Sequence, residues 1–359
     1  MISFHRQAGV ILLQPPRDKA FPSHARFAAP AGDAPPRLLD ELDLAIVHAL
    51  QIDARTPWTR VAAAVRADSA TVARRWEQMQ EERLAWLSCW PQSSQWQSTT
   101  DLAMVRLGAG ADLDAISAPP WALSVEETSA GIVVLVASGS GLRSLGRRVQ
   151  ELTEAASLGA GATAPDMHVV SAVIAEDSSW RTGALDPRGQ RIAAARSHGP
   201  APKPPKPEIV SELTEALAED PRASAATLAS RLGVSEATAR RAVDRAAASG
   251  RLGLGCDLSS WAAGLRRGAM LWAASPDPSA AGGRARRLPH CYRVLQVVGP
   301  APLCISARAT TLTALPEIER ALGDGIEIVD RWTVLGARKR NGHLLDEWDR
   351  STGRVDVRW

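Results

Sequence analysis

Serine, threonine and arginine side chains recur at helical spacing in two short stretches of the chain, where they would share the helix face opposite the apolar residues. Such a face fits the major groove of DNA, because arginine can donate two hydrogen bonds to guanine and hydroxyl groups can donate to phosphates. The candidate DNA-contacting residues are Ser69, Thr71, Arg74, Arg75, Ser235, Thr238, Arg240, Arg241 and Arg245. The alternative interpretation is a solvated helix face in a domain that contacts only proteins.

The two stretches belong to a long internal repeat. Asp53-Ala-Arg55 recurs as Asp220-Pro-Arg222, and Thr71 recurs as Thr238, since 220 − 53 and 238 − 71 both equal 167. A repeat of this length is a duplicated set of domains, because solenoid units are only about 20 to 50 residues long. We therefore expect two DNA-reading heads in one polypeptide.

Three helices are predicted at the start of each copy from the spacing of apolar residues. A short break separates the second helix from the third, which is expected to begin after an N-cap at Asp68 or Ser235. A helix followed by two helices joined by a short turn is the helix-turn-helix arrangement. The segments from Leu84 to Trp90 and from Leu252 to Leu258 follow it and could form a small strand or wing.

The rest of each copy alternates predicted strands and helices in the order β-α-β-β-α-β, over residues 102–174 and 269–335. This order is typical of a ferredoxin-like domain. We therefore predict an α+β chain in which two winged helix-turn-helix domains alternate with two ferredoxin-like βαββαβ domains.

The domain boundaries follow from these elements and from a proline-rich run at residues 199–207, because proline cannot continue a helix or a central strand. We predict a disordered extension at 1–37, helix-turn-helix domains at 38–95 and 208–258, effector or assembly domains at 99–178 and 264–341, a linker rich in proline and arginine at 179–207, and a C-terminal tail at 342–359.

The composition predicts a soluble protein with no membrane partner, because 45% apolar and 23% charged residues are ordinary values and no apolar run could span a bilayer. The few cysteines predict a reducing, cytoplasmic location. Four cysteines without a CxxC pair predict neither a disulfide framework nor a metal site. We expect no cofactor.

The charge distribution argues against tight nonspecific DNA binding. Residues 38–87 hold six arginines against eight acidic residues, and residues 208–253 hold six against seven, so neither head is basic as a whole. Specific binding would then depend on a few arginines of each third helix.

Three segments carry a resemblance to a known family. They are the opening helix from Leu38 to Asp43, the turn and third helix from Ala229 to Arg241, and the strand from His290 to Gly299. These segments resemble the leucine-responsive regulator (Lrp)/AsnC family. The resemblance covers nearly all of residues 38–340, once in each copy.

The resemblance implies a transcription regulator whose effector (RAM) domains pair their sheets and often bind an amino acid. Two copies in one chain would resemble an intramolecular dimer, and the effector domains would allow self-association. The implied effector-binding residues are Ser129, Gly299 and Pro302. The family hairpin has an acidic residue three positions after its glycine, where this chain has Pro302, and this departure favours assembly over an amino-acid-like effector.

Two other functions remain open. Siroheme decarboxylases join a similar helix-turn-helix to a ferredoxin-like domain, and in that interpretation His290 would donate a proton while Arg293 would hold a propionate. The aromatic-proline-tyrosine-asparagine stretch expected after them is absent, and a lone histidine at a strand start is more often a surface or capping residue. The third function is an assembly scaffold that no longer reads DNA.

We predict a transcription regulator that is not an enzyme and has no catalytic residues. Its two heads would read a near-palindromic operator on double-stranded DNA, about one helical turn or a multiple of it apart.

Overall fold

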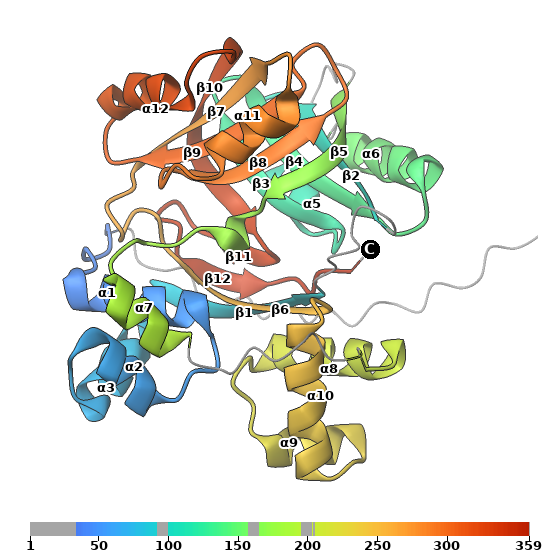
Figure 1. Cartoon of the computed structure of the whole chain (residues 1–359). Coiled ribbons are helices and arrows are strands. Elements are labelled where there is room, and N and C mark those ends of the chain that lie inside the picture. Colours follow the sequence, from blue (N-terminus) through green and yellow to red (C-terminus); the bar gives the residue numbers. More distant parts are fainter. Residues whose placement is uncertain (1–33, 92–99, 157–164, 195–202, 204, 359) are drawn as a thin grey trace, which may run out of the picture.

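The computed structural model describes residues 34–91, 100–156, 165–194, 203 and 205–358, which form two layers (Figure 1). A β-barrel forms the upper layer, and two groups of helices joined by a two-stranded sheet form the lower one. Most of the predicted N-terminal extension, residues 1–33, lies outside the described residues. No helix within the described ranges is both long and apolar enough to span a lipid bilayer.

The first group of helices is α1 (Glu41–Ile52), α2 (Trp58–Val65) and α3 (Ser69–Glu81). Side-chain oxygens start two of them, because Asp40 accepts from the Asp43 N–H and Asp68 accepts from the Thr71 N–H. Helix α2 ends at Arg66, whose φ of 59° turns the chain toward α3. The predicted order of three helices and the predicted cap at Asp68 are both present.

The second group of helices is α8 (Pro207–Glu219), α9 (Ala225–Leu232) and α10 (Glu236–Ala248). Ser224 caps α9 by accepting from the Thr227 N–H, and Ser235 caps α10 in the same way through Thr238. Helix α9 ends at Gly233 with φ of 63°, which is the position equivalent to Arg66. The two groups therefore turn at equivalent places.

Strands β1 (Ala85–Pro91) and β6 (Leu252–Leu258) pair with each other in antiparallel register. Ser88 stands opposite Gly255, which is its own equivalent 167 residues later, so a local pseudo-twofold axis passes between them. The sequence predicted a separate strand or wing in each copy. The structure corrects this prediction, because the two strands pair with each other. A lone strand leaves its backbone N–H and C=O groups unpaired, and here the strand of the other copy satisfies them.

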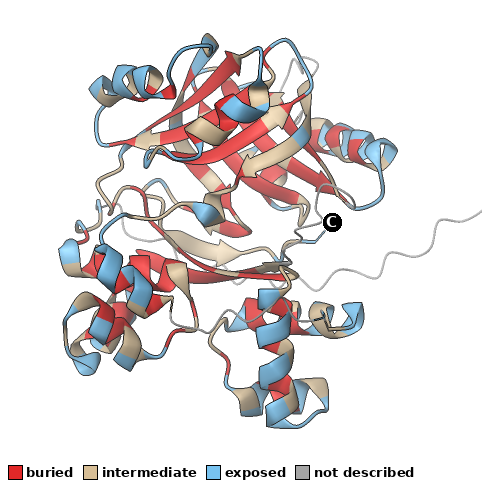
Figure 2. Cartoon of the chain, in the orientation of Figure 1, coloured by how far each residue is buried: buried red, intermediate tan, exposed pale blue. Residues whose placement is uncertain are grey.

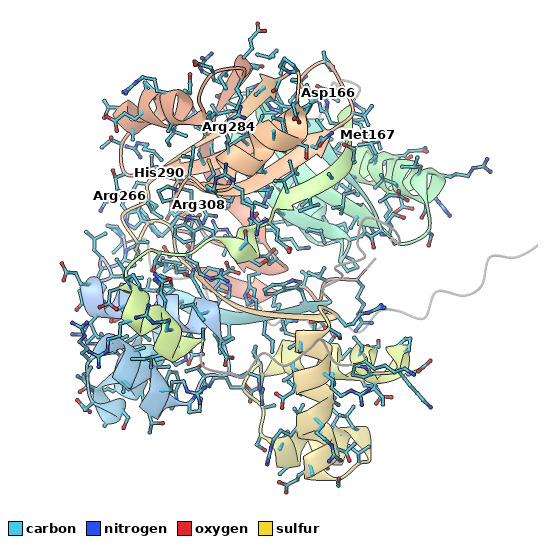
Figure 3. The ribbon with its side chains drawn as sticks, viewed as in Figure 1. Asp166, Met167, Arg266, Arg284, His290 and Arg308 are labelled. Carbon is cyan, nitrogen blue, oxygen red and sulfur yellow. The ribbon has the colours of Figure 1, made fainter. Side chains whose placement is uncertain are left out.

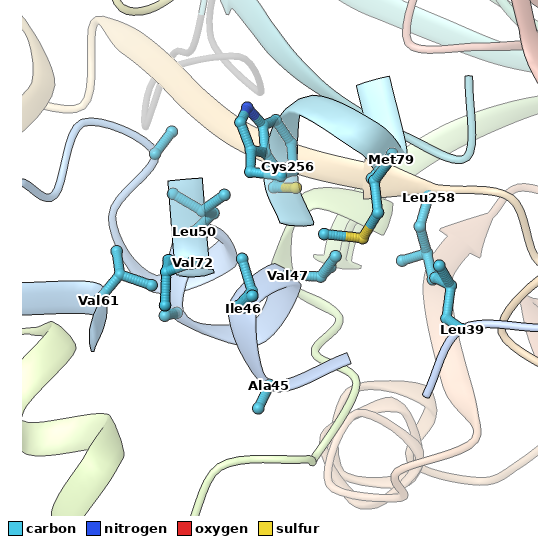
Figure 4. Close-up of a cluster of buried hydrophobic side chains, with 14 of the residues drawn as sticks. Leu39, Ala45, Ile46, Val47, Leu50, Val61, Val72, Met79, Cys256 and Leu258 are labelled. Carbon is cyan, nitrogen blue, oxygen red and sulfur yellow. The ribbon is translucent and has the colours of Figure 1, made fainter. Parts of the chain in front are cut away.

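The paired strands also exchange core residues between the two groups of helices. Cys256 and Leu258 of β6 pack against α1 and α3 in the core of the first group (Figure 4). Cys89 of β1 packs in the core of the second group, together with Leu213 and Leu217. Each group therefore completes its core with a strand from the other copy.

The barrel contains two halves with the same element order. The first half is β2 (Asp101–Leu107), α5 (Leu113–Ser117), β3 (Ala122–Thr128), β4 (Gly131–Ser138), α6 (Leu142–Ala156) and β5 (Asp166–Ala175). The second half is β7 (Arg267–Ala274), α11 (Pro278–Ala285), β8 (Cys291–Val297), β9 (Leu303–Ala309), α12 (Leu315–Leu322) and β10 (Glu327–Arg340). The predicted sequence of strands and helices is thus present in both.

The two halves close into one ring of eight strands. The order of neighbours is β3-β4-β2-β5 in the first half and β8-β9-β7-β10 in the second. Strand β5 pairs with β8, and β10 pairs with β3, so the edges of each half are covered by the other half. Helices α5 and α6 cover one half and α11 and α12 the other, and the strands are mostly buried (Figure 2).

The described parts of the predicted linker and tail contain regular elements that the sequence did not indicate. After the 3₁₀ turn η1 (Asp177–Ser179), the linker forms helix α7 (Pro187–Ala193), which packs on α2. The tail forms β11 (His343–Leu345) and β12 (Ser351–Arg354), which extend the sheet from β10. A further 3₁₀ turn, η2 (Leu312–Ala314), precedes α12.

Candidate nucleic-acid interface

Helix α3 buries one face and exposes the other. Val72, Trp76 and Met79 pack into the core of the first group of helices, while Ser69 and Arg74 are exposed. This division follows from the sequence, because the apolar residues recur at steps of three and four. Ser69 and Arg74 therefore lie on the face of α3 that points away from the core.

Arg75 has a different environment from Arg74, although both were predicted to contact DNA. Its guanidinium is hydrogen-bonded to Asp40 and, at 3.1 Å, to the buried carboxylate of Asp43. Arg37 donates to the same Asp43 carboxylate at 2.7 Å. Arg75 therefore ties α3 to α1, and the sequence pattern alone did not indicate this role.

The equivalent helix α10 also has a buried and an exposed face. Ala239, Val243 and Ala246 are buried, whereas Arg240 and Arg241 are exposed. Two predicted contact residues have partners within the chain. Arg241 donates to the Thr238 hydroxyl at 3.3 Å, and Arg245 donates to the Lys203 carbonyl at 2.8 Å. Within the described residues, Arg74 and Arg240 have no hydrogen-bond or ion-pair partner.

Hydroxyl side chains at the start of α3 and α10 serve as caps or lie beside one. Ser235 accepts from the Thr238 N–H at 3.3 Å, and the hydroxyls of these two residues are 2.9 Å apart. In α3, Asp68 has the capping role, so Ser69 is exposed and Thr71 supplies the capped N–H. The pKa of Asp68 is lowered by its bonds to Thr71, so this cap is ionised at neutral pH.

The two groups of helices are joined by a reciprocal pair of arginines, which the sequence marked as part of the repeat without indicating any contact. Arg55 and Arg222 occupy equivalent positions in the two copies. Each guanidinium donates two hydrogen bonds to backbone carbonyls of the other copy, and the acceptors are Pro221 and Ala223 for Arg55 and Ala54 and Thr56 for Arg222. This contact and the β1–β6 pair hold the two helix groups together.

Inside the barrel, Arg293 is enclosed by acidic groups. It donates to both carboxylate oxygens of Asp177 at 2.8 and 2.9 Å and to Glu126 at 3.1 Å, and Tyr292 donates to the same Glu126 at 2.9 Å. Arg293 holds the pKa of Asp177 below its usual range despite burial. In contrast, His290 is exposed and directly precedes the first residue of β8 (Figure 3). Each of the three guanidinium nitrogens of Arg293 therefore has a carboxylate partner within the chain.

The predicted effector-binding residues lie at two hairpin turns that contact different strands. Ser129 exchanges hydrogen bonds with Thr333 of β10, with N–H···O distances of 2.8 and 3.0 Å. At the other turn, where Gly299 and Pro302 lie, the Val298 N–H donates to the Val169 carbonyl of β5. The two turns thus occupy equivalent joints between the halves of the barrel, and their binding role remains a prediction.

Comparison with known proteins identifies the first group of helices. Residues 39–80 match the model of the AsnC-type helix-turn-helix domain, which confirms the resemblance drawn from the sequence for this segment. No curated protein matches the chain.

Solved structures of low identity match larger parts of the chain. The siroheme decarboxylase NirDL is 14% identical, with 84% of this chain and 93% of that chain covered and a TM-score of 0.47. Its co-complex with an iron-uroporphyrin III analogue matches at 12% identity over the same shares, with a TM-score of 0.48. Escherichia coli AsnC is 20% identical over 37% of this chain and 93% of its own, with a TM-score of 0.33.

Proposed function

We propose that this chain, which carries an AsnC-type helix-turn-helix domain at residues 39–80, is a sequence-specific DNA-binding regulator of transcription with two reading heads. The first head is α1 to α3, and the second is α8 to α10. The observation that carries the proposal is the exposed face of α3, where Arg74 has no partner within the described residues and the opposite face is buried. Arginine in that position suits bidentate contact with guanine.

The second head is supported by its correspondence with the first. Both groups have a capped third helix after a left-handed turn, at Arg66 and Gly233 respectively. Arg240 supplies an exposed guanidinium in the second group, and it has no partner among the residues that the structure describes. The pseudo-twofold relation of β1 and β6 would present the heads to the two halves of a near-palindromic operator.

We further propose that each half of the barrel is a ferredoxin-like effector domain and that the barrel is their intramolecular dimer. The strand order β3-β4-β2-β5 and its repeat β8-β9-β7-β10 support this assignment. In this interpretation the β1–β6 pair and the reciprocal Arg55 and Arg222 contacts fix the separation of the heads, and the barrel offers its remaining surface for self-association.

We propose no reaction for the chain. A tetrapyrrole enzyme of the kind considered above would need Arg293 to hold a propionate, but Asp177 and Glu126 already occupy that guanidinium. The near-neutral charge of both heads supports the scaffold interpretation. Selection of genomic DNA decides between a DNA-binding regulator and a scaffold.

The test is selection of retained fragments from genomic DNA, followed by titration of one fragment across a salt series. We expect a dyad-symmetric site and an affinity that falls as salt rises, because bound phosphates release counterions. Arg74→Ala and Arg240→Ala should each weaken specific binding about 5- to 150-fold, the effect of losing one good base contact. Arg143→Ala is the matched control, since this exposed arginine lies on α6 of the barrel.

Recovery of no enriched sequence would contradict the proposal and favour the scaffold. Equal affinities of the wild-type protein and the Arg74→Ala, Arg240→Ala double variant would remove the assignment of both reading helices. Before any affinity is measured, the melting temperatures of the variants are compared with that of the wild-type protein. Unfolding of a variant is then not mistaken for the loss of a DNA contact.

A further inference from the structure

The third helices of the two groups, α3 and α10, lie apart in the molecule but begin and end at equivalent residues (Figure 1). Each begins one residue after its cap, and equivalent residues are 167 positions apart, as for Thr71 and Thr238. The buried positions also correspond, because Val72, Trp76 and Met79 of α3 have buried apolar counterparts in α10. The exposed faces can therefore be compared residue by residue.

The free guanidinium groups stand at different positions of the two helices. Arg74 of α3 corresponds to Arg241 of α10, whereas Arg240 corresponds to Ala73. Arg241 donates to the Thr238 hydroxyl at 3.3 Å, so Arg240 is the exposed arginine of α10 that has no partner in the described part of the chain. One position along an α-helix turns a side chain by about 100° and moves it by about 1.5 Å. Arg74 and Arg240 therefore reach different places relative to their own helices.

The first residues of the two helices differ in charge. Ser69 opens α3 and its counterpart Glu236 opens α10, and both are exposed. Glu236 has no hydrogen-bond or ion-pair partner among the described residues. A serine hydroxyl suits a phosphate or any base, whereas a carboxylate repels phosphates and accepts from the amino group of cytosine. The start of α10 therefore favours a cytosine, and the start of α3 does not.

We propose that the two heads read half-sites of different sequence, so that the operator is an inverted repeat whose halves differ at the contacted bases. The inverted arrangement follows from the pseudo-twofold relation of β1 and β6. Arg74 contacts a guanine in the first half-site. In the second half-site Arg240 contacts a guanine at a shifted position, and Glu236 contacts a cytosine. This difference deepens the proposed function and rests on it, because both heads must bind DNA.

Different half-sites also fix the orientation of the chain on DNA. The β1–β6 pair and the contacts of Arg55 and Arg222 lie within one chain, so every molecule carries one head of each kind. A homodimer has two identical heads and binds a palindrome equally in both directions. Here, reversal places Arg74 and Arg240 on the wrong half-sites, and each lost contact weakens binding about 5-fold or more. We expect the reversed complex to be at least about 25-fold rarer, because losses at separate positions add.

The first experiment is selection of binding sites from random double-stranded DNA with the full-length protein. We expect inverted half-sites that prefer different bases at the contacted positions. Arg74→Ala should remove the guanine preference in one half-site and Arg240→Ala in the other, each with a loss of about 5- to 150-fold against the best site. Identical half-sites, or loss of preference in both half-sites from either variant, would overturn the proposal.

Glu236→Gln tests the cytosine contact. Glutamine pairs with adenine, so the cytosine preference should fall in the half-site that Arg240→Ala affects and stay unchanged in the other. The matched control is Glu208→Gln, which makes the same change at an exposed acid in the first turn of α8. Melting temperatures of both variants are compared first, because an acid at a helix start also stabilises the helix. A cytosine preference that survives Glu236→Gln would refute the role assigned to Glu236.

Affinity cleavage measures the orientation directly. The four native cysteines are buried, so a cysteine introduced at an exposed position takes up an iron-EDTA reagent selectively. Ala70→Cys and Ala237→Cys place the reagent at equivalent exposed positions of α3 and α10. Each variant should cleave an end-labelled operator beside one half-site, and the two variants should choose opposite half-sites. Equal cleavage beside both half-sites by either variant would refute the proposal.

The wild-type protein separates failure of the proposed function from failure of this inference. If it retains no DNA, both the proposed function and the difference between half-sites are refuted. If it retains DNA with identical half-sites, only the difference is refuted and the proposed function stands. Different half-sites, with cleavage on opposite sides by the two cysteine variants, support both.

Discussion

Arg55 and Arg222 stand 167 residues apart at equivalent positions, and each donates two hydrogen bonds of 2.6 to 2.9 Å to backbone carbonyls of the other copy. Such reciprocity is the mark of a twofold interface, in which the same surface patch is used twice. Here the interface lies within one chain. The two helix groups are consequently held in one relative position without a second molecule.

Replacement of either arginine by alanine should destabilise the chain. Hydrogen bonds to a charged group contribute about 1.5–3 kcal/mol each when buried, and these residues are half-buried, so we expect a loss of about 1–2 kcal/mol in the free energy of unfolding. Arg222→Ala should cost more than Arg55→Ala, because Arg222 also stacks 4.2 Å from Trp58. Urea titration measures both losses, with Arg143→Ala as the control; equal effects of all three variants would contradict the role assigned to this contact.

The buried ion cluster predicts a larger loss. Arg293→Met leaves Glu126 and Asp177 without their cation in the barrel interior, where both carboxylates are at most 8% exposed. Breaking a buried pair by removing one partner costs about 3–5 kcal/mol. The matched control is Arg338→Met, which removes the partner of the adjacent Glu127 in a half-exposed pair and should cost about 1 kcal/mol or less.

Urea unfolding of these two variants at neutral pH gives the comparison. Similar losses in the free energy of unfolding for Arg293→Met and Arg338→Met would show that burial of an ion pair does not determine how much its loss destabilises the fold. A further readout is the pH profile, because the pKa of Asp177 is lowered by Arg293. A lowered carboxyl pKa stabilises the fold above the unfolded pKa, near 4, and this contribution disappears as pH falls through the folded pKa.

The order of elements could be predicted from the sequence because its signals are local. Apolar residues at steps of three and four identified α3 and α10, and the polar residues Asp68 and Ser235 identified their first turns. The 167-residue offset then transferred each assignment from one copy to the other.

Partners that are distant in the chain could not be predicted in this way. The pairing of β1 with β6 and the closure of β10 on β3 depend on which strand edges meet in space, and a strand pattern does not specify its neighbour. The same limit applies to Arg75, which the pattern placed on the exposed face and the structure ties to Asp43.

The segment after η1 is fixed to the first group of helices through a neutral histidine, which predicts a pH effect. The Leu185 N–H donates to His48 Nδ1 at 2.9 Å, so this nitrogen must be unprotonated. Burial, with a contribution from Arg181, lowers the pKa of His48 to about 4. The unfolded chain takes up the proton near pH 6.5 and the folded chain does not. Stability is therefore complete above pH 6.5 and is lost as pH falls from 6.5 to about 4.

His48→Gln should flatten this dependence, because glutamine offers an amide oxygen to the Leu185 N–H and does not titrate. Urea unfolding at pH 7.5, 6.0 and 5.0 would show a slope smaller by up to about 1.4 kcal/mol per pH unit than in the wild type. His343, whose pKa is lowered by burial to about 3, retains its own contribution in both proteins. An unchanged slope would mean that His48 is protonated in the folded chain.

The joint between the two copies can be tested at a glycine of β6. Gly253 stands opposite Trp90 of β1, and a Cβ atom added to Gly253 would lie 2.2 Å from the Trp90 ring. Gly253→Ala must therefore displace the indole or the strand, and overpacking of this kind costs about 1–3 kcal/mol. Gly283→Ala on α11 meets no atom within 4 Å and should be neutral or slightly stabilising. If thermal melting shows Gly253→Ala to be as stable as Gly283→Ala, β1 and β6 do not pair in this register.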